Sequence, residues 1–198
     1  MINKPTKIIV HHFGGSDAAP LSDSSNATAQ DVDSWHKLRW PGFTSTQFKN
    51  DKGEFYHVGY HFVIEKNGKT VQCRGMDEEG AHVIGQNTSS IGVSLAGNFD
   101  LTVPTKAQER AFVKLYAKII AAYPNINAQT IFPHRKYANK TCYGNNLKDD
   151  HFNLLVMTDE SKADISASLM EQISMLKSKI LALLTSKRYS ANETNSKQ

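Results

Sequence analysis

Short apolar runs typical of buried strands alternate along the chain with stretches of helical periodicity, and this alternation constrains the fold more than any other feature. The clearest helix begins at Thr105 and ends before Pro124, because Thr105 and Gln108 match a capping box and the apolar residues that follow keep helical spacing. The clearest strand is the β-branched run at residues 7–12, which ends in His11 and His12. Because strands and helices intermix, the sequence predicts one α/β domain up to about residue 156.

A β-hairpin is predicted around Asn67-Gly68, since this pair tolerates the positive φ angles of a tight turn and strand-like residues flank it. One further helix is expected at residues 31–39, where Val32, Trp35 and Leu38 are spaced to lie on one face. The predicted strands of the hairpin and of the rest of the sheet cover residues 60–65, 70–73, 91–97 and 130–132.

Residues 157–198 are predicted to form a helical appendage and a polar tail outside the domain of residues 1–156. The helix is expected from about residue 164 to residue 185, and its apolar residues recur at spacings of four and three. Three roles remain open for this apolar face: packing within the chain, weak self-association as a parallel coil, or contact with a wall or membrane surface. The residues that form the face are Leu169, Ile173, Leu176, Ile180 and Leu183.

The composition excludes several classes of protein. With 39% hydrophobic and 9% aromatic residues, the chain can build a core and is not intrinsically disordered. Its net charge of +4 suits approach to an anionic polymer, but the basic excess is too small and too dispersed to predict nucleic-acid binding. Two cysteines cannot form a disulfide scaffold, and no run approaches the roughly 20 apolar residues of a membrane span. The first residues do not read as a signal peptide, so we expect a protein made in the cytoplasm.

Eight histidines are present, but their spacing alone does not indicate a metal site. Histidine, cysteine and carboxylate are the usual zinc ligands, and a catalytic zinc site takes three of them. The sequence has no Cys-x-x-Cys pair, and its His-x-x-x-His pair, His57 and His61, runs into a predicted strand. The one local group that stands out is His134 with Lys140 and Cys142, which follows a predicted strand in a segment rich in turn-forming residues.

Five short motifs follow one another between about residue 7 and residue 147. They are Ile9-Val10-His11-His12; Gly59-Tyr60-His61-Phe62-Val63-Ile64 with Asn67-Gly68; Gly80-Ala81-His82; Ser90-Ile91-Gly92-Val93-Ser94-Leu95 with Gly97-Asn98-Phe99; and His134-Arg135 with Lys140-Thr141-Cys142. In this order they resemble the type-two N-acetylmuramoyl-L-alanine amidases, a family that includes short phage lysozyme-type enzymes and animal peptidoglycan-recognition proteins. The resemblance implies a single domain with a central mixed β-sheet flanked by helices.

The resemblance also implies a set of site residues. His11, His134 and Cys142 would be the ligands of a Zn²⁺ cofactor, which leaves one coordination position open for water. Tyr60 and Lys140 would be catalytic and would stabilise the negative charge that develops on the carbonyl oxygen during amide hydrolysis. His82 would line the groove that binds the sugar and peptide of the substrate.

No catalytic or metal-binding role is expected for the other reactive side chains near these motifs. Family members usually carry proline after the metal-site residue, whereas this chain has Tyr143, which we expect to change the stiffness of the loop and which could place an aromatic ring at the groove. Cys73 is expected to be an ordinary buried thiol rather than the partner of Cys142 in a disulfide. His12 and His61 are expected to be structural neighbours of the site, and no role is assigned to His36, His57 and His151.

The resulting hypothesis is a zinc-dependent amidase that cleaves the bond between N-acetylmuramic acid and L-alanine in bacterial peptidoglycan, with a phage or prophage endolysin as the closest kind of protein. An endolysin of this kind would reach the wall after the host membrane is breached. Two alternatives are kept open: a cytosolic amidase that recycles muropeptides, and a module that binds peptidoglycan without cutting it. Loss of the cysteine ligand is usual in such binding modules, and Cys142 is present here.

Overall fold

The computed structural model describes residues 2–15, 19, 21–158, 174, 175 and 177. The chain divides into two units, Met1–Val156 and Met157–Gln198, and the first contains all the strands and the helices α1, α2, η1 and η2. The apolar residues of the predicted C-terminal helix (Leu169, Ile173, Leu176, Ile180 and Leu183) lie outside the described residues, so the role of that helix stays a prediction.

The predicted mixed sheet is confirmed, with strands in the spatial order β3-β2-β4-β1-β5. Strand β1 pairs with β4 and β5 in parallel, β2 pairs with β4 in parallel, and β3 is the antiparallel partner of β2 in the predicted hairpin. Strands β1 to β4 are shorter than the apolar runs that predicted them, and β5 is shifted by one residue. Their bounds are β1 Ile8–His12, β2 Phe62–Ile64, β3 Thr70–Gln72, β4 Ile91–Leu95 and β5 Ile131–Pro133.

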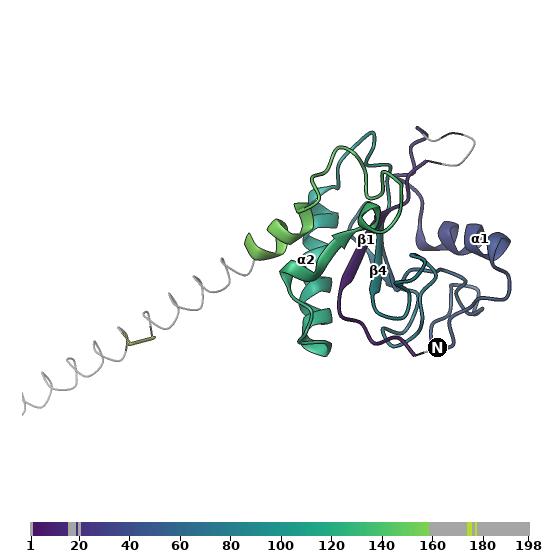
Figure 1. Ribbon diagram of the computed structural model, residues 1–198. Helices are drawn as coiled ribbons and strands as arrows, with labels where there is room; N and C mark the ends of the chain where they lie inside the picture. The colour runs from purple at the N-terminus through teal and green to yellow at the C-terminus, as the bar shows by residue number, and fades with distance from the viewer. Residues whose placement is uncertain (1, 16–18, 20, 159–173, 176, 178–198) are drawn as a thin grey trace, which may run out of the picture. The chain divides into compact units, whose positions relative to one another are not determined.

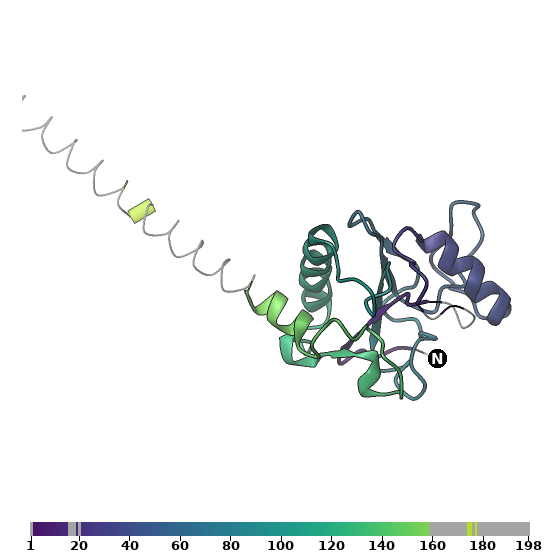
Figure 2. The same cartoon turned by 90° about the horizontal axis from the view of Figure 1, so that it is seen from above.

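Two helices cover the two faces of this sheet. Helix α1 (Ala29–Arg39) begins at a capping box formed by Thr28, and α2 (Lys106–Ala122) begins at the predicted capping box of Thr105. Figures 1 and 2 show α2 on one side of the sheet and α1 on the other. Two short 3₁₀ helices, η1 (Ala128–Thr130) and η2 (His134–Lys136), flank β5, and residues 151–158 are helical. No helix among the described residues is both long and apolar enough to cross a membrane.

The alternation of side chains along β1 separates the core from the site. Ile8 and Val10 belong to the main core, together with Phe112 and Ile119 of α2. Because successive side chains of a strand point to opposite faces, His11 lies on the face that α2 does not cover. It is buried there, in register with Ser94 of β4.

Helix α1 differs from its expected packing. Val32 is buried in a smaller core with Val58 and Val63, but Trp35 is 49% exposed and Leu38 is 86% exposed. The predicted apolar face of α1 is therefore buried only at its N-terminal end. Trp35 borders a cleft instead of entering the core.

Candidate metal centre and cleft

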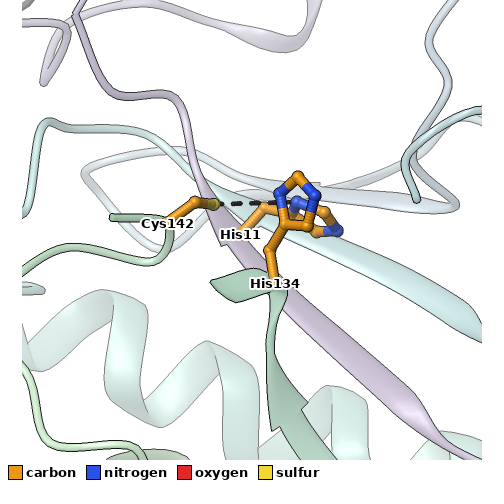
Figure 3. Close-up of side chains that lie close together, drawn as sticks. All are labelled: His11, His134 and Cys142. Atoms are coloured by element: carbon orange, nitrogen blue, oxygen red, sulfur yellow. Dashed lines mark hydrogen bonds between the residues drawn. The ribbon is translucent and has the colours of Figure 1, made fainter. Parts of the chain in front are cut away.

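Three side chains from distant parts of the sequence meet at the end of the sheet. His11 lies near the end of β1, His134 follows the neighbouring strand β5, and Cys142 belongs to the loop after η2. One nitrogen of each imidazole and the sulfur of Cys142 all lie within 4.8 Å of one another, and Cys142 Sγ is 3.7 Å from His11 Nδ1 (Figure 3). The structure thus brings together the three residues expected to be ligands, because the carboxyl ends of adjacent parallel strands meet at one edge.

The protonation states of His11, His134 and Cys142 suit the binding of a metal cation that takes nitrogen and sulfur ligands. Burial lowers the pKa of His11 well below its usual value, and burial followed by the charge of Lys140 lowers the pKa of His134 to about 4. Both imidazoles are therefore neutral at pH 7 and have a lone pair to offer. Burial raises the pKa of the Cys142 thiol to about 12, so a bound cation is required to hold it as the thiolate. Two neutral imidazoles and one thiolate are a zinc donor set.

His82 lies behind His11 and contacts it directly. His82 Nδ1 is 3.0 Å from His11 Nε2, and His82 Nε2 is 3.5 Å from the hydroxyl of Ser90. If His11 donates its Nε2 proton to His82, its Nδ1 lone pair is left free on the side of Cys142. The ring of His82 fits here because residue 92 is glycine: a Cβ at Gly92 would lie 2.7 Å from its carbon atoms. This contact favours a role in orienting a ligand, and the expected contact of His82 with substrate stays a prediction.

Replacing His82 with alanine is expected to weaken zinc binding by about 10- to 100-fold, because the partner that fixes the tautomer of His11 is lost. His82→Asn should recover much of the affinity, since its side-chain oxygen can accept the same proton. Competition with a chelator measures the affinity, and His151→Ala is a matched control remote from the site. If the His82→Ala protein had unchanged zinc affinity but bound the cell wall more weakly, the role of His82 would instead be contact with substrate in the groove.

Arg135 holds the loop that carries Cys142. Its guanidinium donates hydrogen bonds to the carbonyl oxygens of Thr141, Gly144 and Leu147 and pairs with the carboxylate of Asp149. Backbone N–H of Arg135 also donates to the carbonyl of Cys142 at 2.7 Å. The His134-Arg135 motif therefore supplies one candidate ligand and the support of another.

Arg135→Ala is expected to lower the free energy of unfolding of the metal-free protein by about 1–3 kcal/mol, because several carbonyl groups lose their charged donor. Urea unfolding measures this change. Arg135→Lys should recover only part of the loss, since an ammonium cannot reproduce the fork of the guanidinium. Equal stability of the alanine variant and the parent would show that the loop does not depend on Arg135.

A cleft of about 790 Å³ opens over the three candidate ligands and contains both residues expected to be catalytic. The ring centroid of Tyr60 lies 4.9 Å from that of His11. Burial, and then the nearby Cys142, raises the pKa of the Tyr60 phenol well above its usual value, so this hydroxyl keeps its proton and can donate it in a hydrogen bond. The exposed side chain of Lys140 lines the cleft beside His134.

One wall of the cleft was not predicted from the sequence. Trp35, His36 and Arg39 of α1 line it, although no role was expected for His36. His36 Nδ1 accepts a hydrogen bond from the backbone N–H of Gly59 at 2.9 Å, which ties α1 to the segment that leads into Tyr60. The spacing of Trp35 and Arg39, one turn apart, was the available signal, because residues at i and i+4 share a helix face.

The remaining singled-out residues are structural in their contacts. His12 Nδ1 accepts from the backbone N–H of Phe99, and His61 Nδ1 accepts from that of Gly92. Cys73 is a free, buried thiol, and Cys142 is likewise not in a disulfide. Tyr143 does not place its ring at the groove: it is fully buried, packs against Phe152 with ring centroids 5.1 Å apart, and its hydroxyl lies 2.9 Å from the carbonyl oxygen of Asp149.

Comparison with known proteins gives a consistent picture. The family described as N-acetylmuramoyl-L-alanine amidase matches residues 2–145. Peptidoglycan-recognition protein SC2 of Drosophila melanogaster is 27% identical over 143 residues, which cover 70% of this chain and 68% of that protein. The endolysin of Klebsiella phage KP32 is 32% identical over 107 residues, which cover 52% of this chain and 68% of the endolysin. Among solved structures, the N-acetylmuramoyl-L-alanine amidase LysC from Clostridium intestinale URNW aligns with a TM-score of 0.57 and 25% identity, covering 83% of this chain and 87% of that one.

Proposed function

Because the chain belongs to the N-acetylmuramoyl-L-alanine amidase family, we propose that it is a zinc-dependent hydrolase that cleaves the amide between N-acetylmuramic acid and L-alanine in peptidoglycan. The observation that carries this proposal is the meeting of His11, His134 and Cys142 under a cleft that also contains Tyr60 and Lys140. A module that only binds peptidoglycan needs a groove but has no use for two neutral imidazoles and a thiol placed together.

The donor set fits zinc in number and in chemical type. His11, His134 and Cys142 would hold the ion and leave one position open, as in catalytic zinc sites. When bound, zinc supplies a Lewis acid and lowers the pKa of a water molecule toward about 7. The reaction adds the oxygen of one water to the lactyl carbonyl carbon, breaks the carbon–nitrogen bond and returns the free α-amino group of L-alanine.

Tyr60 and Lys140 would act on the carbonyl oxygen, where negative charge develops as the carbon becomes tetrahedral. The phenol of Tyr60 keeps its proton because burial raises its pKa, so it can donate a hydrogen bond to that oxygen at neutral pH. The ammonium of Lys140 brings a positive charge to the same cleft. Both interactions are stronger with a developing oxyanion than with a neutral carbonyl, and this difference is what lowers the barrier.

Helix α1 would help to seat the glycan and the stem peptide. Trp35 gives the cleft an exposed aromatic ring, on which the apolar face of a sugar can pack. Arg39, whose guanidinium lies 4.9 Å from the ring centroid of Trp40, gives it a cation that can pair with a carboxylate of the stem peptide. These contacts orient the amide bond over the candidate metal centre.

We further propose that the protein is an endolysin of a phage or prophage, which acts on the wall after the membrane is breached. The similarity to the endolysin of Klebsiella phage KP32 supports this setting. The cysteine at position 142 argues against the muropeptide-recycling alternative, since the resembling recycling enzymes generally carry aspartate there.

The proposed reaction is tested with purified sacculi and zinc-loaded protein. We expect new amino-terminal L-alanine to appear, which dinitrophenylation detects, without any new reducing sugar ends. Protein that binds sacculi and carries zinc but releases no amino-terminal alanine would instead support the binding-module alternative. New reducing ends would indicate cleavage of the glycan and would overturn the proposed bond specificity.

A further inference from the structure

A row of basic side chains runs along one side of α2. Lys106, Arg110, Lys114 and Lys118 recur at intervals of four residues, and all of them are exposed. Four residues of α-helix advance about 6 Å, so the row presents a positive charge about every 6 Å along the helix. Like charges at this spacing oppose one another and cost about 0.2–0.5 kcal/mol for each adjacent pair. Lys106 is paired with Glu109, so this repulsion acts among Arg110, Lys114 and Lys118.

The row borders a groove of about 530 Å³ between α2 and the β2–β3 hairpin. Arg110, Lys114 and Lys118 line one wall, and the floor includes Phe62 and Leu115. The opposite wall offers neutral polar groups from the hairpin, namely Asn67, Thr70 and Gln72. At one end the hairpin turn closes tightly on α2, since a Cβ at Gly68 would lie 2.7 Å from the carbonyl oxygen of Ala107.

Within the part of the chain that the structure describes, no acidic residue lines this groove. The carboxylate of Glu109 is paired with Lys106 at 2.7 Å, and His151 Nε2 lies 3.4 Å from it. The carboxylate of Glu65 lies toward Lys69 at 3.9 Å. Lys118 donates to the side-chain oxygen of Gln72, a neutral partner, and no carboxylate among the described residues pairs with the three cations of this wall.

The groove and the cleft lie on opposite faces of the sheet. Phe62 and its cross-strand partner Gln72 point toward α2, whereas His11 points away from it. The two sites have no lining residue in common. A polymer held in the groove would therefore leave the cleft free for the stem peptide.

We propose that this groove binds a linear wall polymer whose negative charges are phosphodiesters, and that it acts as a second attachment site on the face of the sheet opposite the cleft. This proposal rests on the proposed function, because that function brings the protein to the bacterial cell wall. A phosphodiester on every short repeat matches a row of evenly spaced cations, and the amides and hydroxyl of the hairpin wall can bond to the polyol hydroxyls between the phosphates. Carboxylates of the stem peptide are a poorer match, because cross-linking converts part of them to amides.

The experiment compares two variants of the full chain with equal net charge. Arg110→Gln/Lys114→Gln/Lys118→Gln removes the charges of the groove, and Lys4→Gln/Lys49→Gln/Lys52→Gln removes three exposed charges elsewhere. Fluorescence anisotropy measures binding to labelled poly(glycerol phosphate) across a range of salt concentrations. Poly-γ-glutamate and single-stranded oligo(dT) of equal charge serve as competing polymers, and circular dichroism checks that each variant is folded.

The groove variant should bind poly(glycerol phosphate) at least tenfold more weakly at low salt, while the control variant stays within twofold of the parent. The slope of log affinity against log salt should become shallower by about 2 in the groove variant, as for three lost phosphate contacts. Equal binding by the groove variant and the parent would overturn the proposal. Tighter binding of poly-γ-glutamate or oligo(dT) would overturn the assigned ligand class.

The failure of this proposal can be separated from the failure of the proposed function. On sacculi stripped of phosphate polymers, the groove variant should release amino-terminal alanine at a rate within twofold of the parent. A large loss there would mean that the groove serves the cleft itself, which contradicts a separate attachment site. If no variant releases alanine, the proposed reaction fails, whereas the binding of poly(glycerol phosphate) is still measured independently.

Discussion

Replacing Cys142 with alanine is expected to abolish amide hydrolysis and to leave the purified protein without stoichiometric zinc. The variant would keep two neutral imidazoles but would lose the thiolate, which is the one charged donor of the proposed ligand set. His134→Ala should have the same consequence. Metal analysis after dialysis and alanine release from sacculi measure the two effects.

The same variants give a stability test that does not depend on activity. Zinc at 100 times its dissociation constant should stabilise the parent by about 2.7 kcal/mol, which corresponds to a rise of roughly 5–10 °C in melting temperature. Cys142→Ala should show no such rise, although without metal it should melt close to the parent. Cys73→Ala, which removes the other buried thiol, is the matched control and should keep the zinc-dependent rise. A Cys142→Ala protein with the zinc affinity of the parent would exclude Cys142 as a ligand.

The sequence predicted the elements whose signals are local. The helix that begins at Thr105 and the hairpin around Asn67-Gly68 depend on capping and turn chemistry within a few residues, and both are present where expected. The family resemblance gave the mixed sheet and the group of His11, His134 and Cys142. Spacing alone could not have found this group, because His134 lies 123 positions after His11 and the pairing of β1 with β5 brings them together.

The features that could not be predicted from the sequence depend on tertiary contacts. Leu38 follows Val32 by six residues, which places it about 120° round the helix, so the core that buries Val32 does not reach it. The sequence around Tyr143 does not indicate whether its ring lies in the groove or in the core. Its position depends on its packing against Phe152. The contact between His82 and His11 likewise depends on the glycine at position 92, on a different strand.

Lys140→Ala and Tyr60→Phe are each expected to lower kcat by about 10²- to 10³-fold while zinc content stays stoichiometric, because each would remove a donor that we propose stabilises the developing oxyanion. Tyr60→Phe deletes only the hydroxyl and leaves the ring that packs 4.9 Å from His11. Since neither group is a candidate ligand, the zinc-dependent rise in melting temperature should persist in both variants. KM should change little, because the two interactions are weak with the neutral carbonyl of the ground state.

Matched substitutions distinguish this role from a general loss of charge or packing. Lys148→Ala removes another exposed lysine of the same segment. Tyr56→Phe removes another phenol whose pKa is raised by burial. Neither residue lines the cleft, so both variants should keep full turnover. Lys140→Arg retains a positive charge in the cleft and should recover part of the rate. If Tyr60 and Lys140 stabilise one oxygen jointly, the double variant should lose less than the product of the two single losses, because each depends on the geometry that the other supports. A Lys140→Ala protein with normal kcat and a raised KM would place Lys140 in substrate binding, and loss of zinc from Tyr60→Phe would place Tyr60 in the support of the metal ligands.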